Sequence, residues 1–205
     1  MIREQEVNSN SVNKLGRIEL ITGCMFAGKT EEFIRRLRRN DYAKKRVVAF
    51  KPSIDNRYSE DLIASHSGAV LKSYPVSSVE QLIEIYKKEN AISPIDIIGI
   101  DEVQFMDKKI VPFIELLANN GVIVIVTGLD KDFRSEPFQN VDKLLVLAEF
   151  VDKLTAICHK CGNFANRTQR IINGEPANWD SPIVLVGETD SYEARCRNCY
   201  KLPKK

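Results

Sequence analysis

The sequence predicts an α/β protein with a parallel sheet, followed by a smaller unit that a bound metal ion stabilises. Over residues 16–153, short apolar runs alternate with stretches of helical periodicity, the pattern of a parallel sheet covered on both faces. A glycine-rich turn joins the first apolar run to the first helix. Residues 154–205 contain two C-x-x-C pairs and little apolar periodicity, so we expect a separate unit there.

The first half of the large unit is expected to contain two strands and one helix. Residues 1–15 are polar and rich in Asn and Ser, which predicts a flexible N-terminus. The run "RIELIT" (17–22) predicts a strand that leads directly into the glycine-rich turn. A basic helix is expected over 29–43, and a second strand over 46–50. The segment 51–68 is polar, turn-rich and without periodicity, so we predict a loop.

The second half of the large unit continues the alternation. Residues 77–90 open with Ser and Glu at capping-box spacing and predict an amphipathic helix. The nearly unbroken apolar run 95–102 ends in two acids, as expected of a buried parallel strand that reaches a functional site. A helix over 108–120 and a further buried strand over 122–128 follow. The pattern therefore supplies strands and helices in the order that a parallel sheet needs.

The small unit is expected to contain short strands and a long irregular segment. Three β-like stretches, 167–173, 183–188 and 192–196, surround a segment rich in Gly and Pro between the two cysteine pairs. A unit of this size seldom folds on a hydrophobic core alone. A metal site would supply the missing stability.

Composition and charge limit the partners that the protein can have. Of the 205 residues, 43% are hydrophobic and 28% charged, which is ordinary for a globular protein. The net charge of +2 gives no general drive toward nucleic acid or an acidic membrane. No apolar run approaches ~18 residues, and the N-terminal stretch lacks the apolar core of a signal peptide. We expect a cytoplasmic protein with no membrane or nucleic-acid partner, in which disulfides are absent.

The turn after the first strand matches the pattern G-x-x-x-x-G-K-[ST]. Its glycines let backbone N–H groups surround a phosphate chain, its lysine adds charge near the terminal phosphates, and its last hydroxyl can bind Mg²⁺. The helix that follows directs its N–H groups and its positive dipole end at the anion. The sequence therefore predicts a nucleotide phosphate site formed by Gly23, Cys24, Met25, Phe26, Ala27, Gly28, Lys29 and Thr30.

Two adjacent acids, Asp101 and Glu102, are the expected partners of that turn. An Asp at the end of a buried strand can hold Mg²⁺ directly or through water. The Glu beside it can accept a proton from the oxygen that attacks the terminal phosphate. That oxygen can belong to water, as in an ATPase, or to a substrate hydroxyl, as in a kinase, and the residues alone leave both open. The alternative is a solvated acid pair without a chemical role.

Four cysteines form two C-x-x-C pairs, which are typical of a closed tetrahedral zinc site with a structural role. The segment between the pairs is longer than the roughly 15–20 residues of a compact zinc ribbon, so it must contain an extended excursion. Redox-active dithiols, or cysteines that are merely buried, are the alternatives. The fifth cysteine lies inside the phosphate loop, where it is expected to fill space. The predicted zinc ligands are Cys158, Cys161, Cys196 and Cys199.

Taken together, these motifs resemble the type II thymidine kinase family, the cytosolic, zinc-containing form found in bacteria and animals. The resemblance covers nearly the whole chain, from "IELITGCMFAGKT" through "KPSIDNRYS", "GIDEVQF" and "GLDKDFRSEPF" to the two cysteine pairs. It implies a RecA-like P-loop NTPase domain over 16–153 and a small zinc-ribbon domain over 154–205. The excursion of that ribbon, about 162–192, would form a lasso over the nucleoside. The segment "NGEPANWDSP" is similar to that of bacterial members.

The activity that the resemblance implies is that of an ATP:thymidine 5′-phosphotransferase, which makes the 5′-monophosphate in DNA-precursor salvage. Deoxyuridine is a further candidate substrate. The implied cofactors are ATP, Mg²⁺ and structural Zn²⁺. The resemblance also implies a homotetramer and feedback inhibition by thymidine triphosphate.

Residue roles follow from the same resemblance. Glu102 would be the catalytic base, taking the proton from the 5′-hydroxyl, and Thr30 and Asp101 would bind magnesium. Further residues near the ATP phosphates would be Asp55, Asn56, Arg57 and Gln104. The thymidine pocket would comprise Met25, Phe105, Leu129, Phe133, Phe138, Thr168, Ile183, Val184, Leu185, Val186, Gly187 and Tyr192.

A second hypothesis comes from a different class of protein. A P-loop ATPase could use its zinc ribbon and the basic run "RRLRRN" (35–40) to engage nucleic acid. Arginines on a helix are more often a solvated face, and the near-neutral net charge argues against this hypothesis.

Overall fold

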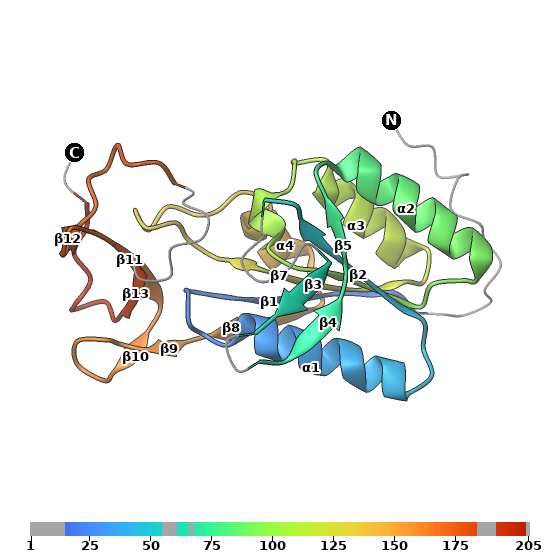
Figure 1. Cartoon of the computed structure of the whole chain (residues 1–205), viewed down its shortest axis with the longest axis horizontal. Coiled ribbons are helices and arrows are strands. Elements are labelled where there is room, and N and C mark those ends of the chain that lie inside the picture. The colour runs from blue at the N-terminus through green and yellow to red at the C-terminus, as the bar shows by residue number, and fades with distance from the viewer. Residues whose placement is uncertain (1–14, 55–60, 66–67, 184–191, 204–205) are drawn as a thin grey trace.

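The computed structural model describes residues 15–54, 61–65, 68–183 and 192–203 (Figure 1). Its largest element is a six-stranded sheet in the order β5-β2-β6-β7-β1-β8. All five pairs of neighbouring strands in this sheet are parallel. The predicted α/β fold with a parallel sheet is therefore confirmed. The strands are β1 (Arg17–Gly23), β2 (Val47–Pro52), β5 (Tyr74–Val76), β6 (Ile97–Ile100), β7 (Ile123–Leu129) and β8 (Phe150–Leu154).

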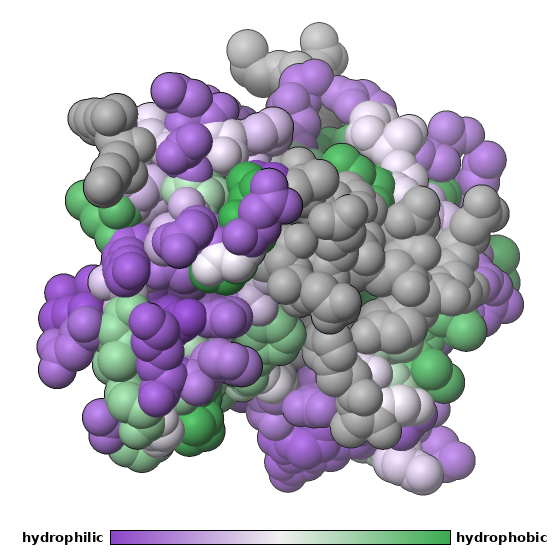
Figure 2. Space-filling view, turned by 60° about the vertical axis from the view of Figure 1, so that its left-hand side comes forward, coloured by the Kyte–Doolittle hydropathy of each residue, from purple (hydrophilic) through white to green (hydrophobic). Residues whose placement is uncertain are grey.

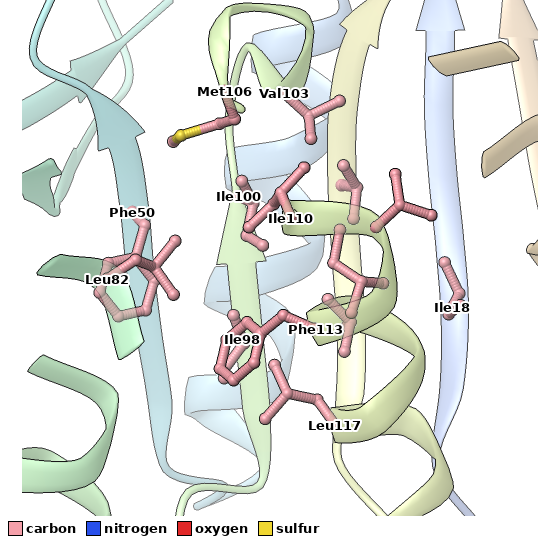
Figure 3. Close-up of a cluster of buried hydrophobic side chains, with 14 of the residues drawn as sticks. Ile18, Phe50, Leu82, Ile98, Ile100, Val103, Met106, Ile110, Phe113 and Leu117 are labelled. Atoms are coloured by element: carbon pink, nitrogen blue, oxygen red, sulfur yellow. The ribbon is translucent and has the colours of Figure 1, made fainter. Parts of the chain in front are cut away.

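Helices cover both faces of this sheet. In Figure 1, α1 lies on one side of the strands, and α2 and α3 lie on the other. Alternation along β7 shows how the sequence serves both layers: Ile123 and Ile125 face the α1 side, whereas Val124 and Val126 belong to the opposite core. Figure 3 shows that opposite core, with side chains of α2 and α3 packed on β1, β2 and β6. The helices are α1 (Lys29–Tyr42), α2 (Val79–Ile92), α3 (Ile110–Asn119) and α4 (Val141–Leu147).

Gly99 in β6 lets α1 lie close to the sheet. A Cβ atom at this position would stand 2.6 Å from Leu37 Cδ1 and 2.8 Å from Phe33 Cζ, both on α1. We expect Gly99→Ala to lower the free energy of unfolding by about 1–3 kcal/mol, because the added methyl overpacks a filled core. Urea denaturation monitored by circular dichroism measures the change. A rise in stability, the usual result where a glycine has room for a methyl, would contradict this packing.

Two local predictions need correction. The predicted loop 51–68 contains β3 (Leu62–Ala64), which pairs antiparallel with β4 (Val70–Lys72), and its first two residues complete β2. The N-terminal cap of α2 is also one residue later than a Ser–Glu capping box would place it. Ser78 is the cap, and its hydroxyl accepts a hydrogen bond from the Gln81 N–H. The Gln81 side chain in turn accepts from the N–H of Ser77, the residue before the cap, at 2.8 Å, so Gln81 and not Glu80 is the side chain that binds back to the start of the helix.

The C-terminal part of the chain forms small antiparallel sheets at the opposite end of the molecule from α2 and α3 (Figure 1). Strands lie within the predicted stretches 167–173 and 192–196, whereas 184–188 of the third stretch lies outside the described residues. Seen from this end, the surface is mainly hydrophilic with scattered apolar patches (Figure 2). The strands are β9 (Ala156–Ile157), β10 (Phe164–Ala165), β11 (Arg167–Ile172), β12 (Glu175–Pro176) and β13 (Tyr192–Arg195). None of the helices in the described ranges has the length and apolar character to span a bilayer.

Candidate functional site

The glycine-rich turn connects β1 to α1 at the carboxyl edge of the sheet. Three residues of this turn adopt positive φ angles: Gly23 at 140°, Phe26 at 66° and Gly28 at 79°. A Cβ atom on Gly23 would lie 2.3 Å from the Leu154 carbonyl oxygen, so a side chain is excluded there. Gly28 is the N-cap of α1 and makes no side-chain cap bond. The first N–H groups of α1 therefore need another acceptor, which a phosphate can supply.

Lys29 is buried directly behind this turn and is 8% exposed. Its Nζ donates a hydrogen bond to the Cys24 carbonyl oxygen at 2.8 Å. Burial lowers the pKa of Lys29, and the negative charges of Glu102 and Asp101 oppose that shift. The ammonium group is thus held against the phosphate loop, where an anion would meet a poorly hydrated cation.

The acid pair follows β6 at the same edge of the sheet. The Asp101 carboxylate accepts from the Thr127 hydroxyl and, at 3.0 Å, from the Glu102 N–H. Glu102 is 9% exposed and has φ 49° and ψ 46°, which is left-handed backbone. A non-glycine residue in that conformation stores strain of about 1–3 kcal/mol, and such strain concentrates at functional sites.

Gln104 ties the Glu102 carboxylate to the neighbouring strand. Its Nε2 donates to Glu102 Oε2, and its Oε1 accepts from the Leu129 N–H at 3.2 Å. The amide is therefore fixed at both ends, and it orients the carboxylate. The family resemblance predicts that Gln104 lies near the ATP phosphates. The structure adds a hydrogen bond from Gln104 to the carboxylate of Glu102.

The predicted pocket residues fall into three groups. Phe105 and Phe138 meet edge to face, with ring centroids 6.3 Å apart. Thr168 of β11 accepts a hydrogen bond from the Met25 N–H at 3.1 Å, so the small unit touches the phosphate loop. Phe133 is buried near two arginines, Arg134 beside it in the chain and Arg170 of the small unit.

Two other predicted pocket residues border a part of the chain that the structure does not describe. Ile183 is 40% exposed, and Tyr192 begins β13 opposite Arg170 of β11. The remaining predicted residues lie outside the described ranges: Asp55, Asn56, Arg57, Val184, Leu185, Val186 and Gly187.

Sequence reasoning missed two polar residues at the end of β7. The Thr127 hydroxyl holds Asp101, as described above. Asp130 is 5% exposed; its carboxylate pairs with Lys131 at 2.5 Å and Lys153 at 3.0 Å. Its charge also acts on Lys29. The available signal was their place at the carboxyl end of the predicted strand 122–128, beside the strand that carries the acid pair.

The four predicted zinc ligands lie together, and their sulfur atoms are all within 4.8 Å of one another. Cys161 Sγ and Cys196 Sγ are 3.6 Å apart, too far for a disulfide and close to the roughly 3.8 Å edge of a ZnS₄ tetrahedron with ~2.3 Å bonds. His159 lies between two of the cysteines but is exposed and faces Glu193 at 3.7 Å. The donor set therefore fits a closed four-thiolate site.

The pKa values of these thiols show how strongly the four groups affect one another. Burial alone would raise the pKa of Cys158, but backbone N–H donors, that of Cys196 first, lower it to about 6. Hydrogen bonding to Cys161 and Cys196 raises the pKa of Cys199 to about 12. Four thiolates this close repel one another, so a bound cation is what would let all of them ionise.

Comparison with known proteins points in one direction. A family model described as thymidine kinase matches residues 16–200. The chain is 67% identical over 200 residues to a thymidine kinase of Mycoplasma mycoides, covering 98% of this chain and 96% of the relative. It is 66% identical over the same shares to a thymidine kinase of Mycoplasma capricolum. A thymidine kinase of Mesoplasma florum is 64% identical over 191 residues, 93% of this chain and 94% of the relative.

Proposed function

This chain belongs to the thymidine kinase family, and we propose that it transfers the terminal phosphoryl group of ATP to the 5′-hydroxyl of thymidine. Deoxyuridine is a second candidate acceptor in the same reaction. The observation that carries the proposal is a buried carboxylate, Glu102, which Gln104 fixes at the same carboxyl edge of the sheet as the phosphate loop and the buried Lys29. The product would be thymidine monophosphate, a precursor for DNA synthesis.

The chain's own residues supply position and charge for this transfer. N–H groups of the loop and of the first turn of α1 would bind the phosphate oxygens, and Lys29 would exchange its bond to the Cys24 carbonyl for the terminal phosphates. Glu102 would accept the proton of the 5′-hydroxyl as that oxygen attacks. A cavity of about 340 Å³ beside Gly28, lined by the first turns of α1 and by Asp152 and Leu154, offers room for more of the nucleotide.

The donor set beside the loop suits magnesium. A threonine hydroxyl and a carboxylate are the hard oxygen ligands that Mg²⁺ prefers, and Asp101 is oriented by Thr127 and by the Glu102 N–H. Thr30 and Asp101 would hold the ion. When bound, it would supply positive charge to the phosphate oxygens.

The nucleoside would bind between the phosphate loop and the small unit. Phe105 and Phe138 offer aromatic faces for a flat pyrimidine ring, and the Met25–Thr168 contact closes one side. The backbone of 183–187 would read the acceptor–donor–acceptor edge of thymine, although 184–187 lie outside the described residues. Residues 154–205 would form a zinc-dependent domain that carries this segment, next to a P-loop domain over 16–153.

Assembly, regulation and location complete the proposal. Strand β8 forms an edge of the sheet, with Phe150 54% and Val151 41% exposed, and such an edge suits contact with a second copy of the chain. We propose a cytoplasmic homotetramer that thymidine triphosphate inhibits, because that molecule combines the nucleoside and the triphosphate that the site would accept.

One assay separates this function from that of a nucleic-acid-dependent ATPase. With Mg-ATP, we expect ADP release only when thymidine is present, with one thymidine monophosphate formed per ADP. The matched control is 5′-deoxythymidine, which keeps the base and the 3′-hydroxyl but lacks the 5′-hydroxyl that accepts the phosphoryl group, and it should release no ADP. Release that single-stranded DNA stimulates and thymidine does not would overturn the proposal.

A further inference from the structure

Two guanidinium groups lie over the ring of Phe133. The Arg134 carbon Cζ is 5.2 Å from the ring centroid and that of Arg170 is 5.6 Å away. These residues come from separate parts of the chain, the loop after β7 and strand β11 of the small unit. The Phe133 carbonyl oxygen also accepts a hydrogen bond from the Tyr200 hydroxyl at 2.6 Å. Phe133 is thus held both through its side chain and through its backbone.

The same two guanidinium groups bind the backbone just before residue 183. Arg134 Nη2 donates to the Ser181 carbonyl oxygen at 3.0 Å, and Arg170 Nη1 donates to that of Pro182. Arg134 also covers the ring of Trp179, with Cζ 5.4 Å from its centroid. The side chains of Arg134 and Arg170 therefore connect the loop after β7, strand β11 and the backbone of 181–182.

Neither guanidinium pairs with a carboxylate anywhere in the described ranges. Arg170 is 2% exposed, and the Nε atoms of both arginines are buried without a hydrogen-bond partner. Arg170 is thus a buried cation, and among the described residues the Phe133 ring and the Pro182 carbonyl oxygen are the groups that compensate its charge. Burial of a charged side chain costs folding free energy, so we expect Arg170 to do more than carry charge on the surface.

We propose that Arg134 and Arg170 are positioning residues that fix Phe133 and the 181–182 backbone in one arrangement and thereby set the affinity for the nucleoside. The inference rests on the proposed function, in which Phe133 and Ile183 belong to the nucleoside pocket. Neither arginine contacts the phosphate loop in the described structure, so the effect is confined to the nucleoside and leaves ATP binding unchanged.

The role requires guanidinium and not positive charge alone. A planar guanidinium stacks on an aromatic ring while its edge donates to a carbonyl, whereas a lysine ammonium offers one point of charge and cannot do both. Arg134→Lys and Arg170→Lys therefore keep the charge and remove the double contact. Arg46→Lys is the matched control, because Arg46 also donates to a backbone carbonyl, that of Glu89, beside the amino end of β2 and away from the site.

The test measures nucleoside and nucleotide separately. We expect either site variant to raise the KM for thymidine on the order of tenfold while the KM for ATP stays within about twofold. Trp179, the single tryptophan of the chain, lies against Arg134, so its fluorescence gives thymidine Kd values without turnover. The same rise in Kd is expected, and Arg46→Lys should leave both constants at parental values.

Three outcomes would overturn the inference: an unchanged thymidine KM in both variants, equal rises for thymidine and ATP, or the same rise in Arg46→Lys. Arg134 is only partly buried, so Arg134→Lys decides the question even where Arg170→Lys fails to fold. Failure of the proposed function is seen separately, as absence of thymidine phosphorylation by the unaltered protein.

Discussion

Glu102→Gln is expected to lower kcat for thymidine phosphorylation by about 10²–10⁴-fold, the usual contribution of a general base. Glutamine keeps the length of the side chain and can still hydrogen-bond Gln104, so the local geometry survives. What it loses is the capacity to accept the proton of the 5′-hydroxyl. Steady-state rates at saturating thymidine and Mg-ATP measure the effect, and turnover at the parental rate would show that another group accepts the proton.

Binding measurements separate loss of the base from loss of the nucleotide site. Burial lowers the pKa of Lys29 and the charge of Glu102 raises it, so Glu102→Gln lowers that pKa further. Lysine is charged below its pKa, and nucleotide binding should therefore weaken at a lower pH in the variant than in the parent. At a pH low enough for Lys29 to be charged in both proteins, the ATP Kd should change little. Glu84→Gln, a 67% exposed carboxylate on α2, is the control that should match the parent throughout.

The elements that the sequence predicted are those whose signal is local. Strands β6 and β7 are buried on both faces, so each appears as a short, nearly continuous apolar run rich in β-branched residues, which favours a buried parallel strand. Helix α1 starts where the glycines end, and its buried face recurs at helical spacing in Phe33, Ile34 and Leu37. In these segments the sequence pattern and the tertiary environment agree.

The elements that it missed depend on distant partners. Strand β8 is exposed along most of its length and has no apolar pattern; it is a strand because it pairs with β1. Strands β3 and β4 have three residues each and exist as a hairpin. For such short segments the pairing partner decides the conformation, and a single sequence does not name the partner.

The candidate site divides in the same way. The phosphate loop and the adjacent acids could be predicted from the sequence, because the residues of each motif lie within a few positions of one another. The left-handed backbone of Glu102 could not be predicted from the sequence. The hydrogen bond between Gln104 and Leu129 connects the segment after β6 to β7, and no local sequence pattern indicates such a contact. The contact between Phe133 and Arg170 likewise joins segments far apart in the chain.

Cys24 shows why the phosphate loop and the cysteine cluster are one structure. It is 1% exposed and packs in the same apolar cluster as Cys158 and Cys196. Its Sγ donates to the Ala165 carbonyl oxygen at 3.4 Å, and burial raises the pKa of its thiol, so it is held as a neutral packing group. The next residue, Met25, donates its N–H to Thr168. One wall of the phosphate loop is therefore built by the small unit.

Removal of zinc is accordingly expected to weaken ATP binding as well as to disorder the small unit. Structural zinc contributes about 10–16 kcal/mol in small metal-dependent folds, far more than this unit can replace by packing. Elemental analysis should give about one zinc per chain, and Cys161→Ser should release it and raise the ATP Kd by at least roughly tenfold, since the loop loses its contacts with Ala165 and Thr168. Kd values are measured by equilibrium dialysis with Mg²⁺ present in every sample.

His159→Ala is the matched control for this zinc experiment, because His159 lies between two ligands without belonging to the sulfur cluster. It should keep both the metal and the parental Kd. If the Cys161→Ser protein is free of zinc and still binds ATP with the parental Kd, the phosphate loop holds its own shape. If elemental analysis finds no zinc in protein prepared in metal-free buffer, the proposed zinc site is wrong. A joint loss of metal and nucleotide affinity, confined to the cysteine variant, is the result that a shared wall requires.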